Sequence, residues 1–164
     1  MNTNLTFIKE KIYDKLRFEL SDYRTEQESK EYDACQFKLN GKIIISRKAK
    51  ITPKKDGQFV TFWKRKGNGT IEPYSDTDQF AFFIVNAESD SELGQFVFPK
   101  SVLIKKGIIS FKGGEGKRAF RVYPIWDKVN SKQAERSQKW QLNYFYKINN
   151  LTDINEISQL FKSE

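Results

Sequence analysis

Lysine and arginine stand beside aromatic residues in three short stretches of the sequence. These stretches are Phe62-Trp63-Lys64-Arg65, Phe120-Arg121-Val122-Tyr123 and Lys139-Trp140. A cation can neutralise a phosphate, and an aromatic ring beside it can stack on an unpaired base, which together hold a single strand without reading its sequence. Because most such rings belong to a core, we expect two of the three tryptophans to be buried, and Trp126 or Trp140 to be the most exposed.

The net charge of +8 is concentrated in two segments of the chain. Residues 42–66 and residues 100–139 each carry +8, whereas residues 67–99 carry −6 and each end carries −1. These lysines could lie on separate strand faces and form no common surface. Because so many like charges are difficult to keep apart, we instead expect them to converge on one surface that attracts polyanions. The residues predicted to contact a phosphate backbone are Lys48, Lys50, Lys54, Lys55, Lys64, Arg65, Lys117, Arg118, Arg121, Lys132, Arg136 and Lys139, with Trp140 beside them.

The sequence contains no histidine, which excludes imidazole bases, histidine-based catalytic dyads and most transition-metal sites. Any catalysis would use carboxylates, Lys, Tyr, Ser or Thr, and the metal that such groups suit is a hard, oxygen-bound ion such as Mg²⁺. The single cysteine, Cys35, cannot form an internal disulfide and alternates with Phe37 and Leu39 in a strand pattern, so it is expected in the core. No resident cofactor is predicted.

The glycine-rich stretch GGEGK at 113–117 partly matches a phosphate-binding P-loop. That pattern also requires Gly at position 111 and Ser or Thr at position 118, and neither is present, so a P-loop is excluded. Four cations around the glycines could still approach a phosphate backbone closely, namely Lys112, Lys117, Arg118 and Arg121, although a plain hairpin tip explains the stretch equally well.

Hydrophobic periodicity predicts the elements that must position these residues. Spacings of three and four indicate helices over residues 4–20, 101–106, 131–148 and 154–161. Alternating or continuous apolar runs indicate strands at 35–39, 43–47, 58–65, 80–85, 96–98, 108–111 and 120–123. Asn40-Gly41 predicts a tight hairpin between the first two strands. The polar stretch 21–31 is expected to connect the first helix to the sheet.

The order of these elements predicts an α/β domain of mixed α+β type, with a central mixed β-sheet flanked by an N-terminal helix and C-terminal helices. One domain over residues 1–164 is expected, because a chain of this length buries enough surface to fold alone. Within it we expect an N-terminal helix and linker at 1–29, a core at 30–148 and a C-terminal helix at 149–164. The absence of a long apolar segment and of a signal-peptide core predicts a cytoplasmic protein without a membrane partner.

Acidic residues precede the first strand of the predicted hairpin, and lysines follow the second. The stretch EYDACQFKLNGKIIISRKAK resembles the PD-(D/E)xK nucleases in layout, which implies a degenerate restriction-endonuclease-like core. In that resemblance Glu31 and Asp33 would hold Mg²⁺, and Lys50 would assist the attacking water. Lys48 stands where the pattern requires an acid, which removes a metal ligand and favours binding over cleavage.

Four longer stretches resemble the MepB family of small bacterial proteins over residues 30–146. They are AKITPKKDGQFVTFWKR, GQFVFPKSVL, EGKRAFRVYPIWD and SKQAERSQKWQLNYF. The resemblance implies membership of that family but carries over no biochemical activity, because none is established for it. These stretches include parts of both basic segments.

Together these observations predict a non-enzymatic protein that binds the phosphate backbone of a nucleic acid through a basic groove with aromatic residues. Two alternatives stay open. The first is a metal-dependent nuclease of PD-(D/E)xK type, which would use Glu31, Asp33 and Lys50 with Mg²⁺. The second is a protein-interaction module whose basic face docks an acidic partner, or whose acidic segment 67–99 docks a basic one.

Overall fold

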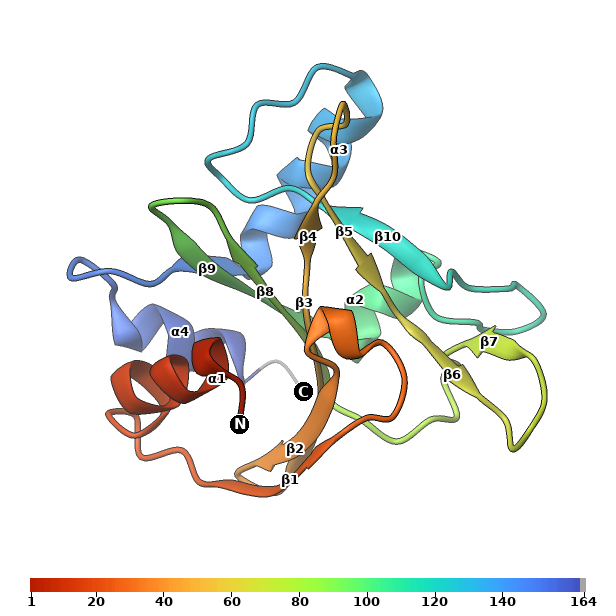
Figure 1. The fold of residues 1–164 in the computed structure, drawn as a ribbon, viewed down its shortest axis with the longest axis horizontal. Coiled ribbons are helices and arrows are strands. Elements are labelled where there is room, and N and C mark those ends of the chain that lie inside the picture. The colour runs from red at the N-terminus through yellow and green to blue at the C-terminus, as the bar shows by residue number, and fades with distance from the viewer. Residues whose placement is uncertain (163–164) are drawn as a thin grey trace.

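The computed structural model describes residues 1–162 as a mixed α+β fold around a six-stranded sheet (Figure 1). The strand order across this sheet is β1, β2, β3, β8, β9 and β11. The bounds are β1 Leu20–Thr25, β2 Cys35–Leu39, β3 Lys42–Lys48, β8 Phe82–Glu88, β9 Leu93–Pro99 and β11 Phe145–Lys147. Neighbouring strands are antiparallel except β3 and β8, which run parallel, so the predicted mixed sheet is confirmed.

Two smaller sheets lie beside the central one. The first contains β10 (Ala119–Val122), β5 (Gln58–Thr61) and β4 (Lys50–Ile51), with β5 in the middle. The second is a two-stranded ribbon of β6 (Trp63–Arg65) and β7 (Ile71–Pro73). One residue separates β3 from β4, and one separates β5 from β6. The basic segment 42–66 therefore passes through all three sheets.

The helices are short and lie on both sides of the central sheet (Figure 1). Helix α1 (Thr3–Ile8) continues into a π-helical turn, η1 (Lys9–Tyr13), and packs with α4 (Ile154–Leu160) on one face. The others are η2 (Lys30–Tyr32), α2 (Lys100–Lys105), α3 (Lys132–Gln141) and η3 (Leu142–Tyr144). Within residues 1–162, every helix is too short or too polar to cross a bilayer.

The central strands are buried on both faces, because their side chains alternate between two cores. On β8, Phe82 and Ile84 pack with α1 and α4, whereas Phe83 and Val85 face the small sheet. All four side chains are fully buried. Phe62 follows β5 and stacks on Phe83 with ring centroids 4.0 Å apart, and this contact holds the three-stranded sheet, called the small sheet below, against the central one. The other face of the small sheet points away from this core.

Cys35 is fully buried in the second core, as predicted. Burial raises the pKa of its thiol to about 11, although a hydrogen bond with Ser46 and the nearby Arg47 act in the opposite direction. The thiol therefore stays protonated at neutral pH, and Cys35 is a packing residue rather than a nucleophile.

Two predicted helices are shorter in the structure, because pairing between distant segments overrides the local pattern. The predicted helix at 4–20 ends at Tyr13, and the polar stretch predicted as a connection supplies most of β1, an edge strand paired with β2. The predicted helix at 131–148 ends at Gln141, and residues 145–147 pair with β9 instead. Gly94 permits this pairing, because a Cβ there would lie 2.4 Å from the Phe145 ring.

The hairpin predicted around the glycine-rich stretch does not form. Strand β10 pairs with β5, and residues 108–111 form only isolated bridges. A tight turn between Phe111 and Gly114 replaces the hairpin tip, with backbone hydrogen bonds of 3.0 and 2.9 Å. Gly116 then packs so closely on the chain that a Cβ would lie 2.4 Å from the carbonyl oxygen of Ile108. Gly116 thus serves close packing of the loop on the body of the protein, whereas Gly113, with a φ of 81°, serves the turn.

Candidate functional site

The tip of the β4–β5 hairpin is joined to the start of α3, and the two lie close together in Figure 1. Asp56 at the tip accepts hydrogen bonds from the backbone N–H of Asn130 at 2.7 Å and from its Nδ2 at 3.2 Å. The next residue, Ser131, caps α3, because its hydroxyl accepts from the backbone N–H of Ala134 at 3.1 Å. The hairpin tip is therefore fixed to the first turn of α3.

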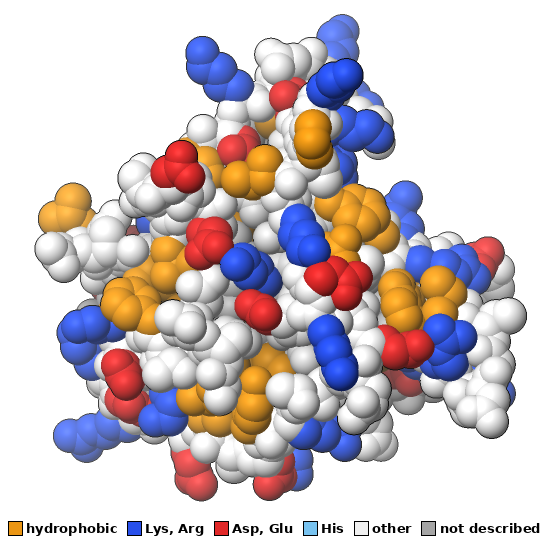
Figure 2. Space-filling model, in the orientation of Figure 1, with side chains coloured by type: hydrophobic (Ala, Val, Ile, Leu, Met, Phe, Trp, Pro, Cys, Tyr) orange, Lys and Arg blue, Asp and Glu red, His pale blue; other side chains and the backbone are white. Residues whose placement is uncertain are grey.

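This junction brings together residues from both basic segments. Lys132, Arg136 and Lys139 are spaced by four and three residues, which places them on one face of α3. With Lys54 and Lys55 from the hairpin tip, they form what we call the hairpin–helix surface. Figure 2 shows Lys and Arg side chains gathered at the top of the molecule, over the hairpin tip and α3.

All five cations of the hairpin–helix surface are exposed. Within the part of the chain that the structure describes, none of their side chains forms an ion pair or a hydrogen bond. Glu135 is the acid within α3, so the helix keeps an excess of positive charge. Exposed cations without an internal partner keep their attraction for an external anion.

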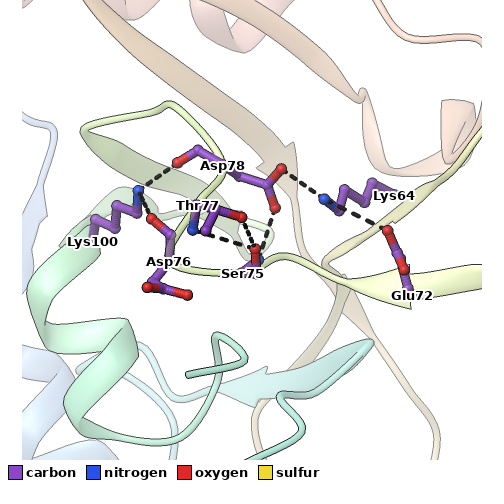
Figure 3. Close-up of polar contacts among 7 residues, drawn as sticks. All are labelled: Lys64, Glu72, Ser75, Asp76, Thr77, Asp78 and Lys100. Atoms are coloured by element: carbon purple, nitrogen blue, oxygen red, sulfur yellow. Dashed lines mark hydrogen bonds and ion pairs between the residues drawn. The ribbon is translucent and has the colours of Figure 1, made fainter. Parts of the chain in front are cut away.

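Lys64 on β6 differs, because acids of the negative segment 67–99 balance its charge (Figure 3). Its Nζ lies 2.6 Å from Asp78 Oδ1 and 3.6 Å from Glu72 Oε1. Asp78 also accepts a hydrogen bond from the backbone N–H of Ser75 at 2.7 Å, and Lys100 donates to its backbone carbonyl oxygen. Lys64 is thus part of a clamp that fixes the loop 75–78.

Arg65 and Arg118 are also matched by acids. They line an open groove of about 710 Å³ between the β6–β7 ribbon and the loop 110–118. Arg65 pairs with Glu28 at 2.8 Å, and Arg118 pairs with Glu115 at 2.9 Å. Lys117 is exposed and forms no ion pair among residues 1–162. Most of the predicted phosphate contacts therefore fall into an unpaired group on the hairpin–helix surface and a largely balanced group around this groove.

Lys48 and Arg121 are both engaged within the protein. Lys48 Nζ lies 2.7 Å from Glu88 Oε1, and this hydrogen bond raises the pKa of Lys48 and lowers that of Glu88. Arg121 on β10 donates from Nε to the backbone carbonyl of Asp56 at 2.8 Å and from Nη2 to Thr52 Oγ1 at 2.6 Å. Arg121 therefore fixes the hairpin tip, although the sequence predicts it as a phosphate contact.

Replacing Arg121 by glutamine is expected to destabilise the protein by about 1.5–3 kcal/mol, because bonds from a charged donor are lost and their acceptors are left poorly paired. The midpoint of thermal unfolding, measured by circular dichroism, should fall by about 5 °C. An unchanged midpoint together with weaker polyanion binding would show that Arg121 contacts the ligand instead.

One residue of the nuclease alternative, Lys50, lies over the ring of Tyr32, the residue between the other two in the chain. Lys50 Nζ lies 4.9 Å from the centroid of the Tyr32 ring, and Glu31 and Asp33 flank Tyr32 in the chain. Among residues 1–162, no three or more Asp, Glu or Cys side chains are placed so that they could hold a metal ion together. Lys50 thus lies over a ring rather than beside a group of carboxylates.

The tryptophans are arranged differently from the expectation. Trp126 and Trp140 both pack against the first core, and Trp140 lies 5.5 Å from Phe98 with Lys106 Nζ 5.3 Å from its ring. All three tryptophans are half-buried, so the expected burial of two of them is not met, and Trp63 is the one that packs against neither core.

The residues that join the hairpin to the helix, Asp56 and Asn130, are absent from the predicted site. One signal could have identified Asp56, because it is the single acid in the basic segment 42–66. A lone carboxylate there is suited to accept N–H groups at a helix start, where the helix dipole favours negative charge.

The chain belongs to the MepB-like family, whose model matches residues 26–147. A solved structure described as the crystal structure of MepB is similar over 92% of this chain and 99% of its own, with 33% identity and a TM-score of 0.78. A bacterial homing endonuclease is similar over 79% of this chain and 81% of its own, with 15% identity and a TM-score of 0.43. The comparison with curated proteins finds no match. The predicted family membership is confirmed.

Proposed function

We propose that the protein binds nucleic acid through the hairpin–helix surface and contacts the phosphate backbone without cleaving it. The observation that supports this proposal is the junction between Asp56 and Asn130, which fixes the hairpin tip with its two exposed lysines to the start of a helix that carries three more exposed and internally unpaired cations. A row of phosphates is the ligand such a surface suits, because each lysine or arginine neutralises one phosphate and releases its counterions.

The pattern of internal ion pairs also favours this surface over the rest of the basic residues. Lys64, Arg65 and Arg118 would have to leave acidic partners before they could bind a phosphate. The side chains of the hairpin–helix surface have no such partner to leave within residues 1–162. Binding of phosphates to the hairpin–helix surface therefore requires no internal ion pair to be broken.

A titration of fluorescent oligonucleotides at several salt concentrations tests the proposal. If each of the five cations neutralises one phosphate of a single strand, the affinity should fall about 100-fold between 50 and 200 mM salt. Equal affinities at the two concentrations would contradict the electrostatic mechanism. Retention of an acidic protein from nuclease-treated lysate, with no affinity for oligonucleotides, would favour the interaction module instead.

The nuclease alternative keeps one supporting observation, the placement of Lys50 beside the segment that carries Glu31 and Asp33. Incubation of DNA and RNA with Mg²⁺ or Mn²⁺ decides between the two functions. Intact substrate is expected. Cleavage that Asp33→Asn abolishes would show that the protein is an enzyme.

A further inference from the structure

The outer face of β5 and β6 carries aromatic side chains that belong to neither core. Val60 and Phe62 point inward and are fully buried. Side chains alternate along a strand, so Phe59, Thr61 and Trp63 point outward, and all three are half-buried. Figure 2 shows hydrophobic side chains beside Lys and Arg on this side of the molecule. We call this set of residues, with Tyr32, the aromatic platform.

The rings of the platform are placed next to cations. Phe59 stands directly between Lys50 and Arg121 in the register of the small sheet. The Tyr32 ring lies 6.4 Å from that of Phe59, and Lys50 Nζ lies 4.9 Å from the Tyr32 centroid. Further along, the Arg65 guanidinium lies 5.7 Å from the Trp63 ring.

Of these cations, Lys50 is the best placed to bind a phosphate. Lys50 is exposed and forms no ion pair in the described part of the chain. Arg65 pairs with Glu28, and Arg121 holds the hairpin tip, so both are already engaged. Lys50 also belongs to the hairpin whose tip carries Lys54 and Lys55. The platform therefore connects with the hairpin–helix surface through one hairpin.

We infer that the aromatic platform stacks unpaired bases, so that the nucleic acid bound by this protein is single-stranded. The inference rests on the proposed function and specifies its substrate class. A partly exposed ring on the surface can stack on a base that is free, whereas the bases of a duplex are already stacked on one another. Phe59 lies on β5 and Trp63 follows four residues later on β6, so the two rings offer separate stacking positions to successive parts of one nucleic-acid strand.

The experiment compares a single-stranded oligonucleotide with an abasic oligonucleotide of the same length, because the two carry equal charge and differ only in bases. The wild-type protein should bind the base-bearing probe at least about fivefold more tightly. Trp63→Ala should weaken binding of that probe roughly 5- to 150-fold and leave binding of the abasic probe unchanged. The salt dependence should not change, because no charge is removed.

Two further variants show whether weaker binding by Trp63→Ala results from lost stacking or from a disturbed fold. Trp63→Phe keeps an aromatic face and should retain most of the affinity. Phe7→Ala is the matched control, because Phe7 is 40% exposed and also lies near a lysine, with Lys11 Nζ 5.9 Å from its ring. This control should bind both probes as the wild type does.

Equal wild-type affinities for the two probes, with salt-dependent binding retained, would overturn the stacking inference and leave the proposed function standing. Weaker binding of both probes by Trp63→Ala would overturn it in the same way. If neither probe binds at low salt, the proposed function fails as well.

Discussion

The triple variant Lys132→Ala, Arg136→Ala, Lys139→Ala should bind a single-stranded oligonucleotide on the order of 100-fold more weakly than the wild type at 50 mM salt. The reason is that these residues supply three of the five unpaired cations of the hairpin–helix surface. The fold should be unaffected, because their side chains are exposed and alanine is a good helix former. Fluorescence anisotropy measures the affinity.

A matched control removes three lysines from another part of the surface. Lys11, Lys15 and Lys162 are exposed, and the helices α1 and α4 near them lie at the lower left of Figure 1, away from α3 at the top. Their replacement by alanine lowers the net charge by the same amount and should cost much less affinity. If both triple variants lose affinity equally, binding depends on total charge rather than on the hairpin–helix surface.

The second large effect concerns the stability of the sheet. Arg47 on β3 is 1% exposed, and its Nη2 lies 2.6 Å from Glu26 Oε2, whose side chain is 19% exposed. Arg47 Nη1 also donates to the backbone carbonyl of Ser46 at 2.9 Å. The guanidinium has been removed from water, so it depends on the carboxylate of Glu26 for compensation.

Replacing Glu26 by alanine should therefore destabilise the protein by about 3–5 kcal/mol, because an uncompensated charge stays buried. The free energy of unfolding in urea measures the effect. Glu88→Ala is the matched control, because it breaks the ion pair with Lys48, where the two side chains are 33% and 41% exposed, together with a weak hydrogen bond of 3.3 Å from Asn4. Loss of this half-exposed pair should cost less than about 1 kcal/mol. Equal costs for the two variants would contradict the structural role of the buried pair.

Elements that form through residues close together in the sequence could be predicted from residue type and spacing. The hairpin at Asn40-Gly41 forms as expected, with φ angles of 52° and 80° that suit Asn and Gly. The helix cap at Ser131 and the basic face of α3 also follow from residue type and spacing. The exposed cations of α3 could be predicted for the same reason.

Contacts between distant segments were not predictable from one sequence. Residues 145–147 form a strand because β9 offers an edge next to Gly94, although their pattern suits the preceding helix. One ion pair of the candidate site also joins residues that are distant in the sequence. Arg65 is neutralised by Glu28, which lies 37 residues earlier in the chain. The sequence alone therefore could not show that Arg65 is less available to a phosphate than the cations of α3.

The central claim is that phosphates bind where the hairpin tip meets α3, and the salt dependence of affinity tests it most directly. The logarithm of the affinity of wild-type protein and of the triple α3 variant should be measured against the logarithm of salt concentration with one single-stranded probe. Each phosphate contact contributes about 0.7 to the slope, so the slope of the variant should be smaller in magnitude by about 2. Equal slopes would show that Lys132, Arg136 and Lys139 contact no phosphates and would contradict the account.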